Sequence, residues 1–179
     1  MSKSKIELKL VSRTNPLYKQ IRDQHYVENH GCIGRQLHYL VYQNEKLVGI
    51  ISGASAVWAC KPRDDFFGID KDNRIAKIAD IINNVVFRLE IRQPNLGTQV
   101  LSTWRKKIQK DWEDKYGSKI VGFETFIFGE NRNGAMYKAD NWIYVGDTQG
   151  SAKHKPHGAY NKGERLVVPK KLIFCKMVW

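Results

Sequence analysis

The sequence has few cysteines and no long apolar run. Cys32, Cys60 and Cys175 are an odd number and form no CxxC pair, which argues against a disulfide framework and against a zinc site built from cysteine alone. We expect them to be reduced, mostly buried thiols of a cytosolic protein. No apolar run approaches the roughly 20 residues that span a bilayer. The first ten residues, MSKSKIELKL, lack the apolar core of a signal peptide, so we expect a cytoplasmic location.

Acidic residues are also scarce relative to basic ones. The 179 residues include 30 Lys and Arg against 18 Asp and Glu, a formal charge of +12. This excess favours a polyanionic partner, with nucleic acid ahead of an anionic membrane surface. A generally solvated basic surface is the alternative. The candidate phosphate contacts are Arg105, Lys106, Lys107 and Lys110 on one predicted helix and Lys153 and Lys155 in a later segment.

The hydrophobic pattern indicates one folded domain spanning residues 1–179. Hydrophobic residues make up 42% of the chain, as in a globular protein. Alternation near residues 6–10 predicts a strand, and spacings of three and four residues predict a long helix over 98–116. The other expected elements are a helix at 17–27, a hairpin at 38–57, a short helical segment at 75–82, strands at 85–91, 120–128, 141–146 and 172–178, and a mobile basic loop at 148–165. This order predicts an α/β fold with a mixed sheet, in which strands 85–91 and 120–128 are adjacent and parallel.

Two ionisable residues are the first candidates for catalysis. Glu124 lies in an apolar strand, where a carboxylate needs a partner or a raised pKa. If Glu124 faces a cleft, it is the best candidate for a general base; a solvated strand face is the alternative. His25, at a helix end, is a second candidate base. It is alternatively a histidine without a role, or a metal ligand with His30, although we expect no metal site.

Several polar and aromatic residues are candidates for substrate binding. Arg35 is placed to clamp a phosphate or carboxylate, or is simply an exposed loop arginine. Ser52 lies near the end of the predicted hairpin, and Trp58 comes directly after the hairpin. They are candidates for lining a pocket, with Trp58 stacking on a base, but a core tryptophan is the alternative reading.

The stretch GENRNGAMYKADNWIYVGDTQG at residues 129–150 suggests a fold family. An asparagine turn, a half-turn of helix with Tyr137, and an aromatic strand follow the strand at 120–128. This order resembles the GNAT acyltransferases, in which a turn before the long helix binds the pyrophosphate of coenzyme A. The resemblance implies cleft roles for Tyr137 as an acid, for Asn141 and Trp142 as substrate contacts, and for Asp147 near the reacting group.

The same resemblance implies a donor site at the turn before the long helix. That family's turn reads Arg/Gln-x-x-Gly-x-Gly/Ala, and this chain has Arg92-x-x-Asn95-x-Gly97. The implied cofactor-binding residues are Arg92, Asn95, Leu96, Gly97 and Thr98. Asn95 stands where the family has glycine, so the donor remains open between an acyl-CoA and another molecule.

A closer resemblance extends over about residues 25–150. Phrases at 25–26, 34–41, 83–87, 94–97, 111–112, 116–117, 124–126, 137–142 and 146–150 are similar, in order, to the family of the A component of the Druantia antiphage system. These phrases include Arg35, Glu124 and Tyr26, and we expect Tyr26 to be a substrate contact. The layout is also similar to the phage Mom proteins, which are GNAT-like and modify the exocyclic amine of adenine.

Together these observations lead to two hypotheses. The first is a GNAT-like transferase that adds a small group to a DNA base in a bacterial or phage-infected cell. The second is a non-catalytic DNA-binding component of an antiphage defence or mobile-element system. The cleft residues favour the first, and the change to Asn95 favours the second.

Overall fold

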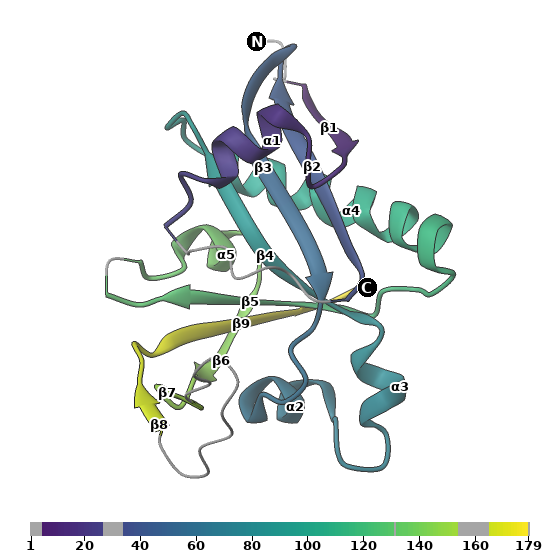
Figure 1. Cartoon of the computed structure of the whole chain (residues 1–179), viewed down its shortest axis with the longest axis vertical. Helices are drawn as coiled ribbons and strands as arrows, with labels where there is room; N and C mark the ends of the chain where they lie inside the picture. Colours follow the sequence, from purple (N-terminus) through teal and green to yellow (C-terminus); the bar gives the residue numbers. More distant parts are fainter. Residues whose placement is uncertain (1–4, 27–33, 131, 154–164, 179) are drawn as a thin grey trace.

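The computed structural model describes residues 5–26, 34–130, 132–153 and 165–178. Seven strands form one sheet in the order β1-β2-β3-β4-β5-β9-β6, and β7 and β8 form a separate pair (Figure 1). The strands are β1 Ile6–Val11, β2 Gln36–Gln43, β3 Lys46–Ser55, β4 Ile81–Leu89, β5 Gly122–Phe128, β6 Ile143–Asp147, β7 Ser151–Lys153, β8 Arg165–Val167 and β9 Lys171–Met177. The helices are α1 Pro16–Arg22, α2 Lys61–Phe67, α3 Arg74–Ile78, α4 Leu96–Tyr116 and α5 Ala135–Ala139.

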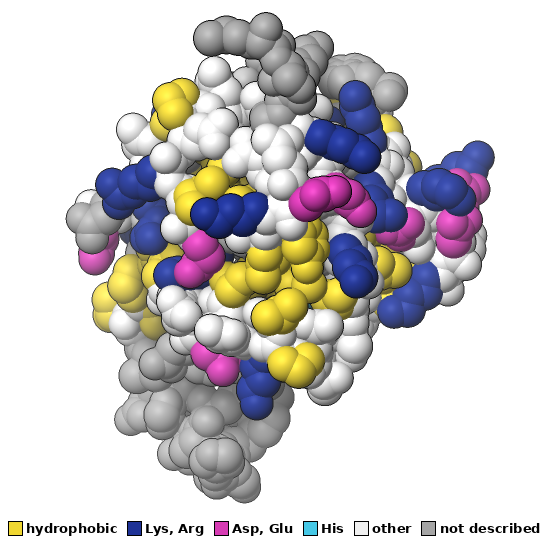
Figure 2. All heavy atoms as spheres, turned by 90° about the horizontal axis from the view of Figure 1, so that it is seen from above, with side chains coloured by type: hydrophobic (Ala, Val, Ile, Leu, Met, Phe, Trp, Pro, Cys, Tyr) yellow, Lys and Arg dark blue, Asp and Glu magenta, His cyan; other side chains and the backbone are white. Residues whose placement is uncertain are grey.

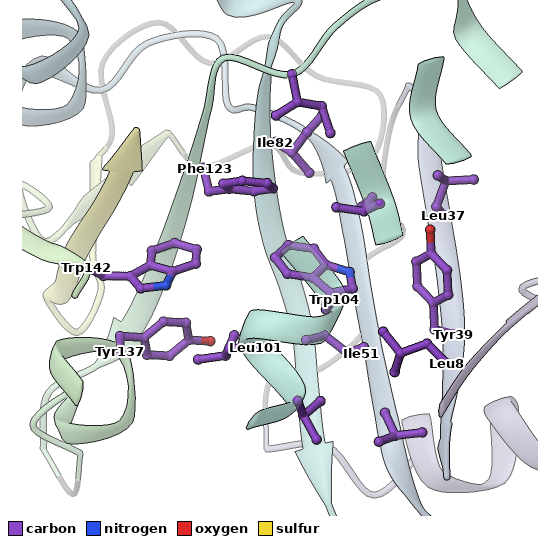
Figure 3. Close-up of a cluster of buried hydrophobic side chains, with 14 of the residues drawn as sticks. Leu8, Leu37, Tyr39, Ile51, Ile82, Leu101, Trp104, Phe123, Tyr137 and Trp142 are labelled. Atoms are coloured by element: carbon purple, nitrogen blue, oxygen red, sulfur yellow. The ribbon is translucent and has the colours of Figure 1, made fainter. Parts of the chain in front are cut away.

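The helices cover the sheet from both sides. On one face, α4 buries Val100, Leu101, Trp104, Ile108 and Trp112 against side chains of both halves of the sheet. Figure 3 shows Trp104 in the middle of this core, with Phe123, Tyr137 and Trp142 on one side. On the other face, α1 packs over the β2–β4 half and α2 over the β5–β9 half. The expected mixed α/β sheet is confirmed.

The crossover from β4 to β5 is the feature that positions the site. The two strands are parallel neighbours joined through α4, as the sequence predicts, but they pair only from Ile81 opposite Gly122 to Asn83 opposite Glu124. Beyond that point β5 turns away from β4, and α5 lies beside the gap (Figure 1). Both strands therefore leave backbone groups facing the space between them.

Several elements differ from the sequence expectations. Helix α2 lies in a segment where no element was expected, and β4 begins at Ile81 instead of residue 85. Helix α1 ends at Arg22 instead of continuing to residue 27, and Asp23 caps it. The expected helical segment at 75–82 is wrong in its second half, because Ile81 and Ile82 are fully buried residues of β4. Within the expected loop at 148–165, β7 pairs with β8 in antiparallel register; residues 154–164 lie outside the described part of the chain. None of the described helices has the length and apolar character needed to cross a membrane.

Candidate functional site

A large cleft of about 1930 Å³ opens where β4 and β5 part. The residues of the splay that line it include Asn84 and Val86 on β4 and Thr125 and Ile127 on β5. The segment after α1 closes one side and the β3–α2 connection closes another. Other polar, charged and aromatic residues of the cleft lining are His25, Tyr26, Trp58, Arg132, Tyr137, Asp147 and Lys171.

A buried hydrogen-bond network links the two strands at the point where they separate. The Thr125 hydroxyl donates to the Asn84 carbonyl at 3.1 Å. The Asn84 side-chain amide donates to the Ser52 carbonyl at 2.9 Å and the Val86 carbonyl at 3.2 Å. These two bonds fix the amide nitrogen, so its oxygen must accept, and it accepts from the Tyr137 hydroxyl at 2.7 Å. Asn84 therefore holds the phenol of Tyr137 at the splay.

The β4 strand carries an irregularity beside this network. Ser52 pairs with Val86 and Gly53 with Asn84, so Val85 is an extra residue in the ladder. A bulge bends a strand and re-aims its backbone and side chains, and bulges are frequent next to active sites. Val85 itself lines the cleft.

A second, smaller hollow adjoins the start of α4. It is lined by Arg92, Gln93, Pro94, Asn95, Gly97, Thr98 and Arg132, among others. The N-terminal N–H groups of a helix have no partner within the helix and favour an anion. Phe87, Arg132 and Met136 line both this hollow and the cleft, so the two spaces meet at these residues.

Asn95 adopts the backbone conformation that glycine would supply. Its φ is 62°, and asparagine is among the few residues other than glycine that enter this left-handed region readily. The departure from the GNAT turn therefore changes the side chain but keeps the shape of the turn. Gly97 has no room for a side chain, because a Cβ would collide with Met136.

The other three implied donor residues differ in their position. Leu96 is 1% exposed and belongs to the main core, so it anchors the turn and does not line the hollow. Thr98 lines the hollow, and its hydroxyl donates to the Asn95 carbonyl at 2.9 Å. Arg92 is exposed at the rim.

Glu124 does not face the cleft, which is a correction to the sequence interpretation. It is 0% exposed and lies outside the cleft lining, on the α2 side of the sheet. One carboxylate oxygen accepts from the Arg63 guanidinium and the other from the Val57 amide at 2.9 Å. Burial raises the pKa of Glu124 to about 7, although Arg63 and Val57 act against this rise. Its contacts make it one half of a buried ion pair.

Arg63 explains why a carboxylate is tolerated at this depth. The guanidinium is also 0% exposed and donates to Asp64 at 2.7 Å and to the Val57 carbonyl at 2.7 Å. Buried charges persist when they are paired and hydrogen-bonded. The pair ties α2 and the β3–α2 connection to β5.

Ser52 belongs to a buried polar cluster under α1 and lies outside the cleft lining. Its hydroxyl lies 2.7 Å from the Tyr18 hydroxyl and 3.0 Å from His38 Nδ1. The other ring nitrogen of His38 lies 3.0 Å from the Gln36 amide oxygen. Burial, followed by nearby Arg13 and other cations, lowers the pKa of His38 to about 4. The cluster fastens α1 to the sheet.

Three further candidates lie apart from the cleft. Arg35 donates to the Ser118 hydroxyl at 3.0 Å and covers the Tyr116 ring. Trp142 is 3% exposed, donates to Asp140 at 2.9 Å and packs on Tyr137. Asn141 is exposed in a left-handed turn with φ 59°. The structure therefore does not bring these three residues to the cleft.

Four other candidates do line the cleft. His25 is half-buried, with its ring centroid 4.7 Å from that of Tyr26. Trp58 is 63% exposed, so the alternative of a core tryptophan is wrong. Asp147 is exposed and accepts from the Tyr144 hydroxyl at 2.7 Å. Among the described residues, no group of three His, Cys, Asp or Glu side chains is placed to hold a metal; His30 lies outside them.

Most of the candidate phosphate contacts on α4 form ion pairs with acidic residues. Arg105 makes two bonds to Asp140, at 2.9 and 2.8 Å, and is 18% exposed. Lys107 pairs with Asp111 and Lys110 with Asp114, one helical turn on. Lys106 is exposed. None of the four lines the cleft. The Lys153 side chain and all of Lys155 lie outside the described part.

The sequence interpretation missed Asn84 and Arg132. Asn83 and Asn84 lie in the otherwise apolar start of β4, which is a signal for a buried polar role. The strand was expected to begin at residue 85, so neither asparagine was placed inside it. Arg132 lies in the asparagine turn, where nothing in the sequence distinguishes it from a solvated arginine.

Comparisons with solved structures agree with this geometry. A Bacillus subtilis acetyltransferase in complex with CoA aligns over 98% of this chain and 100% of its own, with a TM-score of 0.64 and 9% identity. A GNAT family acetyltransferase from Elizabethkingia anophelis with acetyl-CoA bound aligns over 97% and 98%, with a TM-score of 0.60 and 8% identity. At these identities the likeness shows the fold alone, which is the GNAT fold.

A third neighbour is longer than this chain. It is the Salmonella typhimurium acetyltransferase that modifies the N-terminal serine of ribosomal protein L7/L12, with a TM-score of 0.51 and 11% identity. The match covers 81% of this chain but 65% of that one.

The comparison with protein families is more specific. No curated protein matches the chain. The family model described as Druantia protein DruA matches residues 2–171, nearly the whole chain. The chain therefore belongs to the Druantia protein DruA family, and its fold is the GNAT fold.

Proposed function

We propose that this protein uses an acyl-CoA-type donor to transfer a small group to a base in DNA. The observation that carries the proposal is the junction of the two spaces. A hollow at the start of α4 meets a large cleft at the splay of β4 and β5, with Tyr137 held between the strands. A donor and an acceptor need such a meeting point.

The donor side fits a pyrophosphate in shape and charge. The N-terminal end of a helix favours an anion, and the hollow lies at the start of α4. Arg92 and Arg132 add positive charge to the same hollow. The left-handed Asn95 keeps the turn open, and Gly97 has no side chain to fill it. Acyl-CoA would supply an activated thioester here, and the thiol of coenzyme A would be the leaving group.

Tyr137 is placed to act on the reacting atoms. It lines the cleft, and burial raises the pKa of its phenol, so the group stays protonated at neutral pH. Its proton is directed to Asn84 at 2.7 Å. Thr125 also interacts with the phenol, and a phenol oxygen with two lone pairs can still accept from a second partner. An exocyclic amine of a base, which has its own N–H donors, suits that position.

A general base is required because the lone pair of an exocyclic amine is delocalised into the ring. Because Glu124 lies outside the cleft lining, the candidates for the general base are His25 and Asp147, which do line it. We assign the role to His25, because an imidazole titrates near neutral pH. Asp147 is committed to the Tyr144 hydroxyl.

The donor is tested by titrating acetyl-CoA and CoA into the protein in a calorimeter. We expect binding that weakens about tenfold in Arg92→Gln, since a charge-assisted contact is lost. Lys106→Gln, an exposed charge on the same helix outside the hollow, is the matched control. Binding that is absent, or equal in both variants, would remove the donor assignment.

The acceptor is tested separately by mass spectrometry of nucleosides from cells that express the protein. We expect a modified nucleoside with the wild type and its loss with Tyr137→Phe. Adenine is the first base to inspect, because the sequence layout resembles the Mom proteins, which modify its exocyclic amine. Unmodified DNA from cells in which the protein binds acetyl-CoA would rule out a DNA base as acceptor.

A non-catalytic DNA-binding component is the second candidate. It is favoured by the exposed aromatic and basic side chains of the cleft, which serve binding without chemistry. DNA binding without donor binding in the two experiments would select it.

A further inference from the structure

Two exposed aromatic side chains line the cleft, and each carries an arginine on one face. Tyr26 is 42% exposed and Trp58 is 63% exposed. They come from different parts of the chain, the segment after α1 and the β3–α2 connection. Large exposed rings that gather inside a concave site indicate a ligand-binding surface, because buried core packing does not explain them.

Neighbouring side chains hold the Tyr26 ring in place. The Arg132 guanidinium carbon lies 3.7 Å from the ring centroid, which is a close stacking contact. Phe128 meets the ring edge-on with centroids 5.9 Å apart. Lys171, another cleft residue, lies 4.7 Å above Phe128. The His25 ring also meets Tyr26, with centroids 4.7 Å apart. Three side chains therefore position the tyrosine, and its ring stays 42% exposed.

Trp58 is held in a comparable way. The Arg74 guanidinium carbon lies 5.9 Å from its ring centroid. The same arginine donates to the Trp58 carbonyl at 2.8 Å and to Asp64 at 2.9 Å. Asp64 also pairs with the buried Arg63. Arg74 and Trp58 are therefore anchored to the interior through Asp64.

We propose that these two rings are stacking platforms for unpaired bases, so that the cleft binds single-stranded DNA. This inference rests on the proposed DNA substrate and narrows it to an unpaired strand. A pre-positioned aromatic ring with a free surface stacks on any base, and adjacent arginines contact the phosphates. In a duplex the base faces are already stacked, and enzymes that modify a base act on unpaired or extruded nucleotides.

The test is a fluorescence-anisotropy titration of the full chain without any donor. The probe is a labelled thymidine-rich strand of about 12 nucleotides, within the usual site sizes of single-strand binders. The same strand annealed to its complement, and a uridine-rich RNA of equal length, are the comparison probes. Leaving out the donor separates this inference from the transferase activity.

Four variants and one control test the platforms. We expect Trp58→Ala and Tyr26→Ala each to weaken binding of the single strand roughly 5- to 150-fold, the range of one lost base stack. Trp58→Phe and Tyr26→Phe keep a ring and retain most of the affinity. Tyr144→Ala removes an exposed tyrosine, 48% exposed, that does not line the cleft; it should bind like the wild type.

The outcomes separate the alternatives. Weaker binding of the duplex, with little sensitivity to the alanine variants, supports the inference. Duplex binding as tight as that of the single strand, or alanine variants that bind like the wild type, would overturn it. Tighter binding of the RNA would overturn the choice of DNA. Single-strand binding in a protein that modifies no nucleoside would instead contradict only the transferase proposal.

Discussion

At the residue scale, buried charges decide what individual side chains do. Glu124 looks catalytic in the sequence because it is a lone carboxylate in an apolar strand. In the fold it meets Arg63, which is equally buried. A pair of this kind is strongly destabilising when one partner is removed, because the other charge remains buried and uncompensated.

We therefore predict that Glu124→Gln lowers the free energy of unfolding by about 3–5 kcal/mol. The measurement is chemical denaturation of the variant and the wild type. The double variant Arg63→Met/Glu124→Leu, which removes both charges, should recover much of the loss. A Glu124→Gln protein with wild-type stability and no activity would return Glu124 to a catalytic role.

His38 gives the protein a dependence of stability on pH. Its folded-state pKa is about 4, below the ordinary value of about 6.5. The folded state therefore resists protonation, so the contribution of His38 is complete above about pH 6.5. It declines as the pH falls toward 4, by roughly 3 kcal/mol in total.

This prediction is checked by denaturation at several pH values. The wild type should lose stability between about pH 6.5 and 4, and His38→Gln should lose less over the same window. Parallel curves for the two proteins would show that other groups cause the decline.

At the scale of elements, the start of α4 depends on one left-handed residue. We predict that Asn95→Gly keeps acetyl-CoA binding and stability, because glycine adopts φ near 62° at no steric cost. Asn95→Val should cost about 1–2 kcal/mol of stability and weaken donor binding. Gln93→Val, in the same turn but outside the left-handed region, controls for the valine. Equal effects at 93 and 95 would contradict the conformational explanation.

The exposed side of α4 separates structural from available charge. We predict that Arg105→Gln destabilises the protein by about 1.5–3 kcal/mol, because its two bonds to the Asp140 carboxylate are lost. Lys106→Gln, at an exposed neighbour, should change stability by less than about 0.5 kcal/mol. An Arg105→Gln protein that melts like the wild type but loses DNA affinity would identify Arg105 as a DNA contact.

At the scale of the whole molecule, basic residues outnumber acidic ones, with a formal net charge of +12. Figure 2 shows Lys and Arg interspersed with Asp and Glu around apolar side chains on one face. Available cations at the cleft include Arg132 and Lys171, and burial lowers the pKa of Lys171. Affinity for DNA would then come from a few phosphate contacts near the cleft.

We predict that the logarithm of DNA affinity falls linearly with the logarithm of salt concentration, by about 0.7 per phosphate on a single strand. Arg132→Gln should reduce this slope by about one contact, whereas Lys106→Gln should leave it unchanged. Titrations at several salt concentrations measure the slope. Affinity that stays constant with salt would remove nucleic acid as the partner.

The sequence determined the main strands, α4, the parallel crossover and the turn before α4, because these follow from local signals. It did not predict α2 or the β7–β8 pair. Periodicity defines α4, and the turn from Arg92 to Gly97 is contiguous in the chain. The net charge of the chain and its resemblance to the Druantia family could also be recognised from the sequence, since neither depends on which residues meet in space.

Only the tertiary structure decided which way the side chains of the strands point and which charges are already paired. Glu124 and Thr125 are neighbours in the sequence. Glu124 pairs with Arg63 on the α2 side of the sheet, whereas Thr125 lines the cleft. A shift of one residue reverses the faces of a strand, and the register is set by distant partners. Arg63, Asp140 and Asn84 lie 61, 35 and 53 positions from the residues they bind. Contacts over such separations exist only once the sheet has formed.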